Sequence, residues 1–142
     1  MIRETGDEVP MEFINSYPTA CAWAGRALSA LVTFALFADA AKILFSRSKT
    51  KEEFAATGFA DSAATPLSII ILVCAILYAI PQTAVLGAIL VTGFLGGAIC
   101  THFRLGVIAS PPQIISFVLG LMAWGGLYLR NDQVRSLLPF VM

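Results

Sequence analysis

The sequence predicts an all-α fold, a transmembrane four-helix bundle, and three observations support this prediction. Of the 142 residues, 58% are hydrophobic and only 13% are charged, which is unusual for a soluble domain. Four apolar segments are each roughly long enough to cross the ~30 Å hydrocarbon core of a bilayer. Polar or turn-forming stretches separate these segments at residues 46–62, 81–83 and 105–112. We therefore expect the lipid bilayer to be the main environment of the chain.

The first apolar segment covers residues 23–45, and its charged residues are its most informative feature. Asp39 lies about a turn and a half inside the segment, where an unpaired carboxylate is costly in lipid. Lys42 follows three residues later on the same helical face, so a local ion pair is the simplest explanation. A role for Asp39 in a binding site is the alternative. Before this segment, residues 1–22 form a predicted N-terminal tail at the membrane surface. Residues 1–18 have four acids, one base and no sustained period, and we expect this part to be largely irregular.

A pair of antiparallel helices is expected in the middle of the chain. The second apolar segment covers residues 63–80 and the third covers residues 84–103. The turn between them, Pro81-Gln82-Thr83, is too short for anything except an antiparallel return. Before the second segment, residues 46–53 predict a charged loop, and residues 54–62 are consistent with a short interfacial segment.

Glycines in the third segment predict close helix packing. Gly93 and Gly97 form a G-x-x-x-G pattern, which lets another helix backbone approach closely in lipid. The pattern supports packing and indicates no chemistry. The candidate packing residues are Gly87, Gly93, Gly96 and Gly97.

The fourth apolar segment covers residues 113–129, and residues 131–142 are expected to form a C-terminal tail. Four crossings would place both termini and the Pro81 turn at one end of the bundle. An interfacial belt of aromatic side chains is expected at that end, because amphipathic rings favour the headgroup region. Its predicted members are Tyr17, Trp23, Tyr78, Trp124 and Tyr128.

The opposite end of the bundle holds the candidate polar site. The first and third segments both finish there, which would bring Asp39, Lys42, His102 and Arg104 to a similar depth. Such a set could relay protons or hold an anionic or quinone-like headgroup. Alternatively, the three basic residues mark the lipid headgroup boundary and a neighbour neutralises the carboxylate.

Composition argues against several other classes of protein. The formal net charge is zero, so the chain has no basic field with which to bind nucleic acid. Cys21, Cys74 and Cys100 are too few and too scattered for a disulfide framework, and we expect them to act as apolar filler. One histidine and one deep carboxylate supply too few ligands for a metal site. No cofactor is evident, although the polar site would suit a quinone.

Several motifs point to a known family. The runs LYAIP at residues 77–81, TAVLGAIL at residues 83–90 and TGFLGGA at residues 92–98 precede the final His102 and Arg104 of the third segment. The first segment has a D-x-x-K spacing, and the chain ends in the pattern W-x-x-L-x-L-R…R-x-L-L-P. Together these motifs resemble the DoxX-like family of small four-helix membrane proteins, over most of the chain after residue 23.

Two departures qualify what the resemblance implies. Ile71 stands where the family typically has an acidic residue, and Gln82 stands where it usually has arginine. The resemblance implies the four-helix scaffold without a settled reaction, since relatives are linked only loosely to quinone-coupled sulfur oxidation and membrane redox complexes. If the missing carboxylate belongs to a family site, this member has kept the scaffold without that chemistry.

We expect a non-catalytic integral membrane protein of the bacterial inner membrane, an accessory or structural subunit that packs in a larger membrane complex. One alternative is a quinone- or redox-associated component with a polar site at one membrane face. Another is a small-solute carrier acting as a homo-oligomer, although four short helices without an inverted repeat make a poor transporter alone.

Overall fold

A computed structural model describes residues 11–137 of the chain, and the regular structure of this part is entirely helical. Four of its helices are long and apolar enough to cross a membrane, as predicted. The elements in chain order are α1 (Met11–Phe45), α2 (Arg47–Thr57), η1 (Asp61–Ala63), α3 (Ala64–Ala79), α4 (Ala84–Arg104), α5 (Pro111–Arg130) and α6 (Asp132–Leu137).

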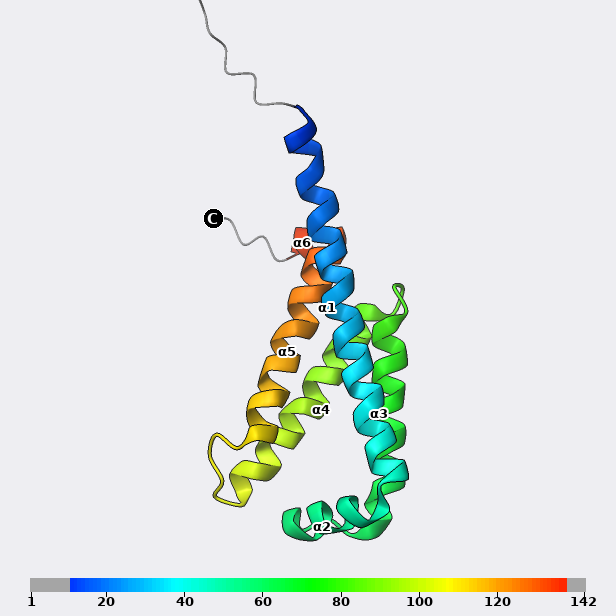
Figure 1. Cartoon of the computed structure of the whole chain (residues 1–142), viewed down its shortest axis with the longest axis vertical. Coiled ribbons are helices and arrows are strands. Elements are labelled where there is room, and N and C mark those ends of the chain that lie inside the picture. Colours follow the sequence, from blue (N-terminus) through cyan, green and yellow to red (C-terminus); the bar gives the residue numbers. More distant parts are fainter. Residues whose placement is uncertain (1–10, 138–142) are drawn as a thin grey trace, which may run out of the picture.

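The four long helices form an antiparallel bundle in which α1 and α4 are diagonal to each other (Figure 1). α1 packs against α3 and α5, and α4 packs against the same two helices. The Pro81 turn and α6 lie toward one end of the bundle. At the other end, α2 lies across the bundle, near the loop that joins α4 to α5. We call these two ends of the bundle the turn end and the α2 end.

The bundle is apolar on its outside as well as in its centre. Val32, Ala75 and Val91 are fully buried between the helices. On the outer surface, Phe34 is 73% exposed and Ile115 is 58% exposed, and such large apolar side chains occur on all four long helices. Soluble monomers rarely expose apolar surface so extensively. Contact with lipid accounts for this surface, and the protein is a multi-pass membrane protein.

Close helix contacts depend on glycine at three positions. A Cβ atom on Gly87 of α4 would lie 2.2 Å from the backbone nitrogen of Tyr78 in α3. On the other side of the bundle, a Cβ on Gly25 of α1 would lie 2.8 Å from the nitrogen of Arg130 in α5, and one on Gly126 would lie 2.8 Å from a serine hydroxyl of α1. These glycines let the backbones approach to distances that a side chain would forbid.

Of the four predicted packing glycines, Gly87 alone makes a close helix contact in the described part of the chain. Cβ atoms built on Gly93, Gly96 and Gly97 would meet no described atom within 4 Å. The rule that glycines allow close packing identifies positions that can accept a neighbour, but it does not say whether the neighbour belongs to the same chain.

Two predicted irregular segments are helical. The first helix already includes Met11, so the prediction of a largely irregular tail is wrong for residues 11–18, while residues 1–10 lie outside the described part. Adding residues to an existing helix is easy once tertiary packing has fixed its apolar part. The predicted charged loop at residues 46–53 belongs to α2. Its Lys, Arg and Glu residues are good helix formers, and Thr50 and Phe54, spaced by four, are buried on one face.

Candidate functional site

The four predicted site residues all lie in the last two turns of α1 and the last turn of α4, at the α2 end of the bundle. The predicted ion pair between Asp39 and Lys42 is not formed. The Lys42 ammonium donates instead to both carboxylate oxygens of Glu53 in α2, at 2.7 and 3.0 Å. Glu53 lies eleven residues after Lys42, and the sequence did not indicate this pairing because residues 46–53 are predicted to form a loop.

Arg104 and His102 also make local contacts. The Arg104 guanidinium donates to the carbonyl oxygen of Thr57 at 3.2 Å, and this carbonyl belongs to the last turn of α2. Carbonyls in a last helical turn lack partners within the helix, so the contact caps α2. The Nδ1 atom of His102 lies 2.9 Å from the carbonyl oxygen of Ala98 in its own helix.

Two of the predicted site residues thus hold α2 across the end of the bundle. Lys42 attaches α2 to α1, and Arg104 attaches it to α4. Asp39 is exposed at this end, and no ion pair involving it occurs in the described part of the chain. The hydrogen bonds of Lys42, Arg104 and His102 have different partners, and none of them joins two of the four predicted site residues.

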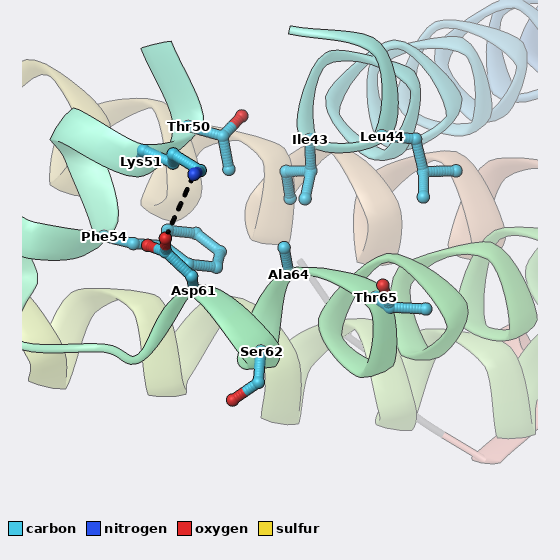
Figure 2. A pocket seen from close by; sticks show the side chains of 9 residues that line it. All are labelled: Ile43, Leu44, Thr50, Lys51, Phe54, Asp61, Ser62, Ala64 and Thr65. Carbon is cyan, nitrogen blue, oxygen red and sulfur yellow. Dashed lines mark ion pairs between the residues drawn. The ribbon is translucent and has the colours of Figure 1, made fainter. Parts of the chain in front are cut away.

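A cavity of about 330 Å³ lies beside α2 and contains none of these four residues. Figure 2 shows Lys51 of α2 facing Asp61 of η1 across it, and their charged atoms are 3.4 Å apart. Phe54 lies beside this pair, and Ile43 lines the wall contributed by α1. Both partners are largely exposed, so the ion pair contributes little stability. We assign no reaction to this cavity.

The most extensive polar network surrounds Tyr78, which the sequence placed in the interfacial belt. That prediction is wrong, because Tyr78 is fully buried. Its hydroxyl donates to the carbonyl oxygen of Ala123 at 2.8 Å and lies 3.1 Å from the Ser29 hydroxyl. Since a tyrosine has a single hydroxyl hydrogen, Ser29 is the donor in the second contact. One side chain of α3 therefore connects α1 and α5.

Arg130 completes the network at the turn end. Its guanidinium donates to the Tyr78 carbonyl oxygen at 2.9 Å and lies over the Tyr78 ring, 5.2 Å from the ring centre. The preceding carbonyl, that of Leu77, accepts a hydrogen bond from the Thr83 hydroxyl at 2.8 Å. These contacts satisfy carbonyls at the end of α3, which would be costly to leave unpaired near lipid. In the sequence, the LYAIP run at residues 77–81 and the nearby Gly87 are the features that mark this part of the chain.

The described residues contain no cluster of metal ligands. Within residues 11–137, no three His, Cys, Asp or Glu side chains gather closely enough to hold a metal ion. The three cysteines are free, with Cys74 buried and the other two exposed. Ile71 is fully buried in the centre of the apolar core.

The fold and these contacts define a multi-pass membrane protein, helical in its described part, in which Tyr78 and Arg130 join the long helices by hydrogen bonds. Residues 27–126 match the sequence profile of the DoxX-like family. The chain belongs to this family. No curated protein and no solved structure matches the chain significantly.

Proposed function

We propose that this DoxX-like protein is a non-catalytic accessory subunit that packs against other membrane helices through the outer face of α4. The observation that carries the proposal is the open G-x-x-x-G surface formed by Gly93 and Gly97. Both residues are exposed, and a Cβ on either would meet nothing within 4 Å in the described part of the chain.

The cost of glycine in a helix supports this reading. A glycine inside a helix is less favourable than alanine by roughly 0.8–1 kcal/mol. At Gly25, Gly87 and Gly126 close packing offsets that cost, because a Cβ would overlap with a neighbouring helix. Gly93 and Gly97 have no such contact in this chain, so a helix from another chain would give them the same role.

The use of the polar residues also supports a structural role. Lys42 and Arg104 contact α2, while Arg130 and Tyr78 join the helices at the turn end. Ile71 provides no carboxylate where relatives typically have one. The quinone- or redox-associated alternative, with Asp39, Lys42, His102 and Arg104 as its site, stays a prediction, as does location in the bacterial inner membrane.

Substitution of the α4 glycines tests the proposal. The tagged full chain is expressed in its native host, extracted in a mild detergent and sized by native electrophoresis and native mass spectrometry. We expect the wild type to migrate in an assembly larger than one chain, and the double variant Gly93→Leu/Gly97→Leu to migrate as a single chain, because the added side chains block the backbone approach.

Ala30→Leu is the matched control, since Ala30 is an exposed residue of a membrane-spanning helix and lies outside the glycine surface of α4. This variant should keep the wild-type assembly. The mass of the assembly distinguishes a second copy of this chain from a different subunit. A wild-type protein isolated as a stable single chain would contradict the accessory-subunit proposal.

A further inference from the structure

A second cavity, of about 400 Å³, lies at the turn end of the bundle. Residues from α1, the start of α4, α5 and the beginning of α6 line it together with Pro81 of the α3–α4 turn. Its charged lining residues are Arg26, Arg130 and Asp132. Two guanidinium groups therefore share one cavity at the end of the membrane-spanning helices.

The close contact between α1 and α5 sets the two arginines beside each other. A Cβ on Gly25 would lie 2.8 Å from the backbone nitrogen of Arg130, so the residue after Gly25 is held at the depth of Arg130. The position of Arg26 therefore follows from the packing of the bundle.

Each guanidinium also lies over an aromatic ring. Arg26 lies over Trp23 and Arg130 lies over Tyr78, both 5.2 Å from the ring centre. Stacking over a ring restricts the guanidinium plane and leaves its N–H edges available. Arginine has five N–H donors, and the contact of Arg130 with the Tyr78 carbonyl uses one of them. Donors therefore remain for a ligand.

The local charge favours an anion. Asp132 also lines the cavity, but its carboxylate is 94% exposed and lies 3.4 Å from the guanidinium of Arg135. Because Arg135 pairs with Asp132, the charges of Arg26 and Arg130 give the cavity a net positive charge. Planar guanidinium groups bind phosphate through paired N–H donors, which a lysine ammonium cannot reproduce.

We propose that this cavity binds the phosphate group of an anionic phospholipid through Arg26 and Arg130. A lipid is the favoured source of the phosphate because the cavity opens where α3 and α5 end, at the membrane boundary, beside the exposed Pro81 turn. The acyl chains would extend along the apolar outer surface of the bundle. This proposal is independent of the α4 surface discussed above.

Lipid binding by the purified full chain tests the proposal. The protein in a neutral detergent is titrated with phosphatidylglycerol, and bound lipid is measured by native mass spectrometry together with the shift in melting temperature. Arg26→Gln is the principal variant, because Arg26, unlike Arg130, donates no hydrogen bond to another helix in the described structure. We expect it to weaken phosphatidylglycerol binding about tenfold, the loss of one guanidinium–phosphate contact. Arg26→Lys should bind with intermediate affinity.

Lys51→Gln is the control, since it removes the same charge at the opposite end of the bundle. It should bind phosphatidylglycerol as the wild type does. Equal helix content of the wild type and the three variants by circular dichroism would show that the difference arises at the site. Titration with inorganic phosphate distinguishes the source: saturable stabilisation by phosphate alone, lost in Arg26→Gln, would retain the anion site and overturn the lipid assignment. Equal phosphatidylglycerol affinities of Arg26→Gln and Lys51→Gln would overturn the proposal.

Discussion

Replacement of Gly87 by alanine is expected to destabilise the protein by about 3 kcal/mol, at the upper end of typical overpacking effects. The added Cβ would lie 2.2 Å from the nitrogen and 2.4 Å from the Cα of Tyr78. Both atoms belong to the backbone, so no side-chain rotation relieves the overlap and α3 and α4 must separate. The measurement is unfolding in mixed detergent micelles, followed by circular dichroism.

Gly93→Ala is the matched control for this prediction. The substitution lies in the same helix and adds the same methyl group, but in open space. Helix propensity alone predicts a gain of roughly 0.8–1 kcal/mol for the purified single chain. If the two alanine variants unfolded alike, the close contact between α3 and α4 would be wrong.

Loss of the Arg130 side chain is expected to have the second-largest effect. In Arg130→Leu, the Tyr78 carbonyl loses a charged donor at 2.9 Å, and the buried Tyr78 ring loses the cation above it. A hydrogen bond to a charged group contributes about 1.5–3 kcal/mol. A cation over a ring adds about 0.5–1 kcal/mol at exposed sites. We expect a total loss of about 2–3 kcal/mol in the same unfolding measurement, with part of the gross loss offset by the apolar leucine.

Arg135→Leu provides the comparison for Arg130→Leu. Arg135 also donates to a carbonyl, that of Leu129, and also lies over a tyrosine ring. It is exposed, however, and its pair with Asp132 is solvated, so its removal should cost less than about 1 kcal/mol. A loss for Arg135→Leu equal to that for Arg130→Leu would contradict a special role for the Tyr78 network.

The membrane-spanning helices were predictable from sequence because their signal is local. Runs of apolar residues of the length of a bilayer and a three-residue turn at Pro81 suffice to predict antiparallel crossing helices. The helical state of α2 was not visible in the same way. Its residues are charged, and the burial of Thr50 and Phe54 depends on contacts with other segments.

The hydrogen-bond and ion-pair partners of the polar residues could not be predicted from the sequence either. Helical spacing suggested that Lys42 would pair with Asp39, whereas the long lysine side chain reaches Glu53 of a neighbouring helix. Position near a turn suggested that Tyr78 would be interfacial, whereas Ser29, Ala123 and Arg130 surround it in the bundle. Each partner comes from a distant part of the chain, so only tertiary packing determines the pairing.

The most direct test of the central claim is the sidedness of single cysteines in native membranes. In a chain whose three native cysteines are replaced by alanine, Gln82→Cys marks the turn end, and Ser48→Cys and Ile108→Cys mark the α2 end; all three positions are exposed. We predict that a membrane-impermeant maleimide labels Ser48→Cys and Ile108→Cys from one side of the membrane and Gln82→Cys from the other. Labelling of Gln82→Cys and Ile108→Cys from the same side would contradict a bundle in which α3 and α4 both cross the bilayer.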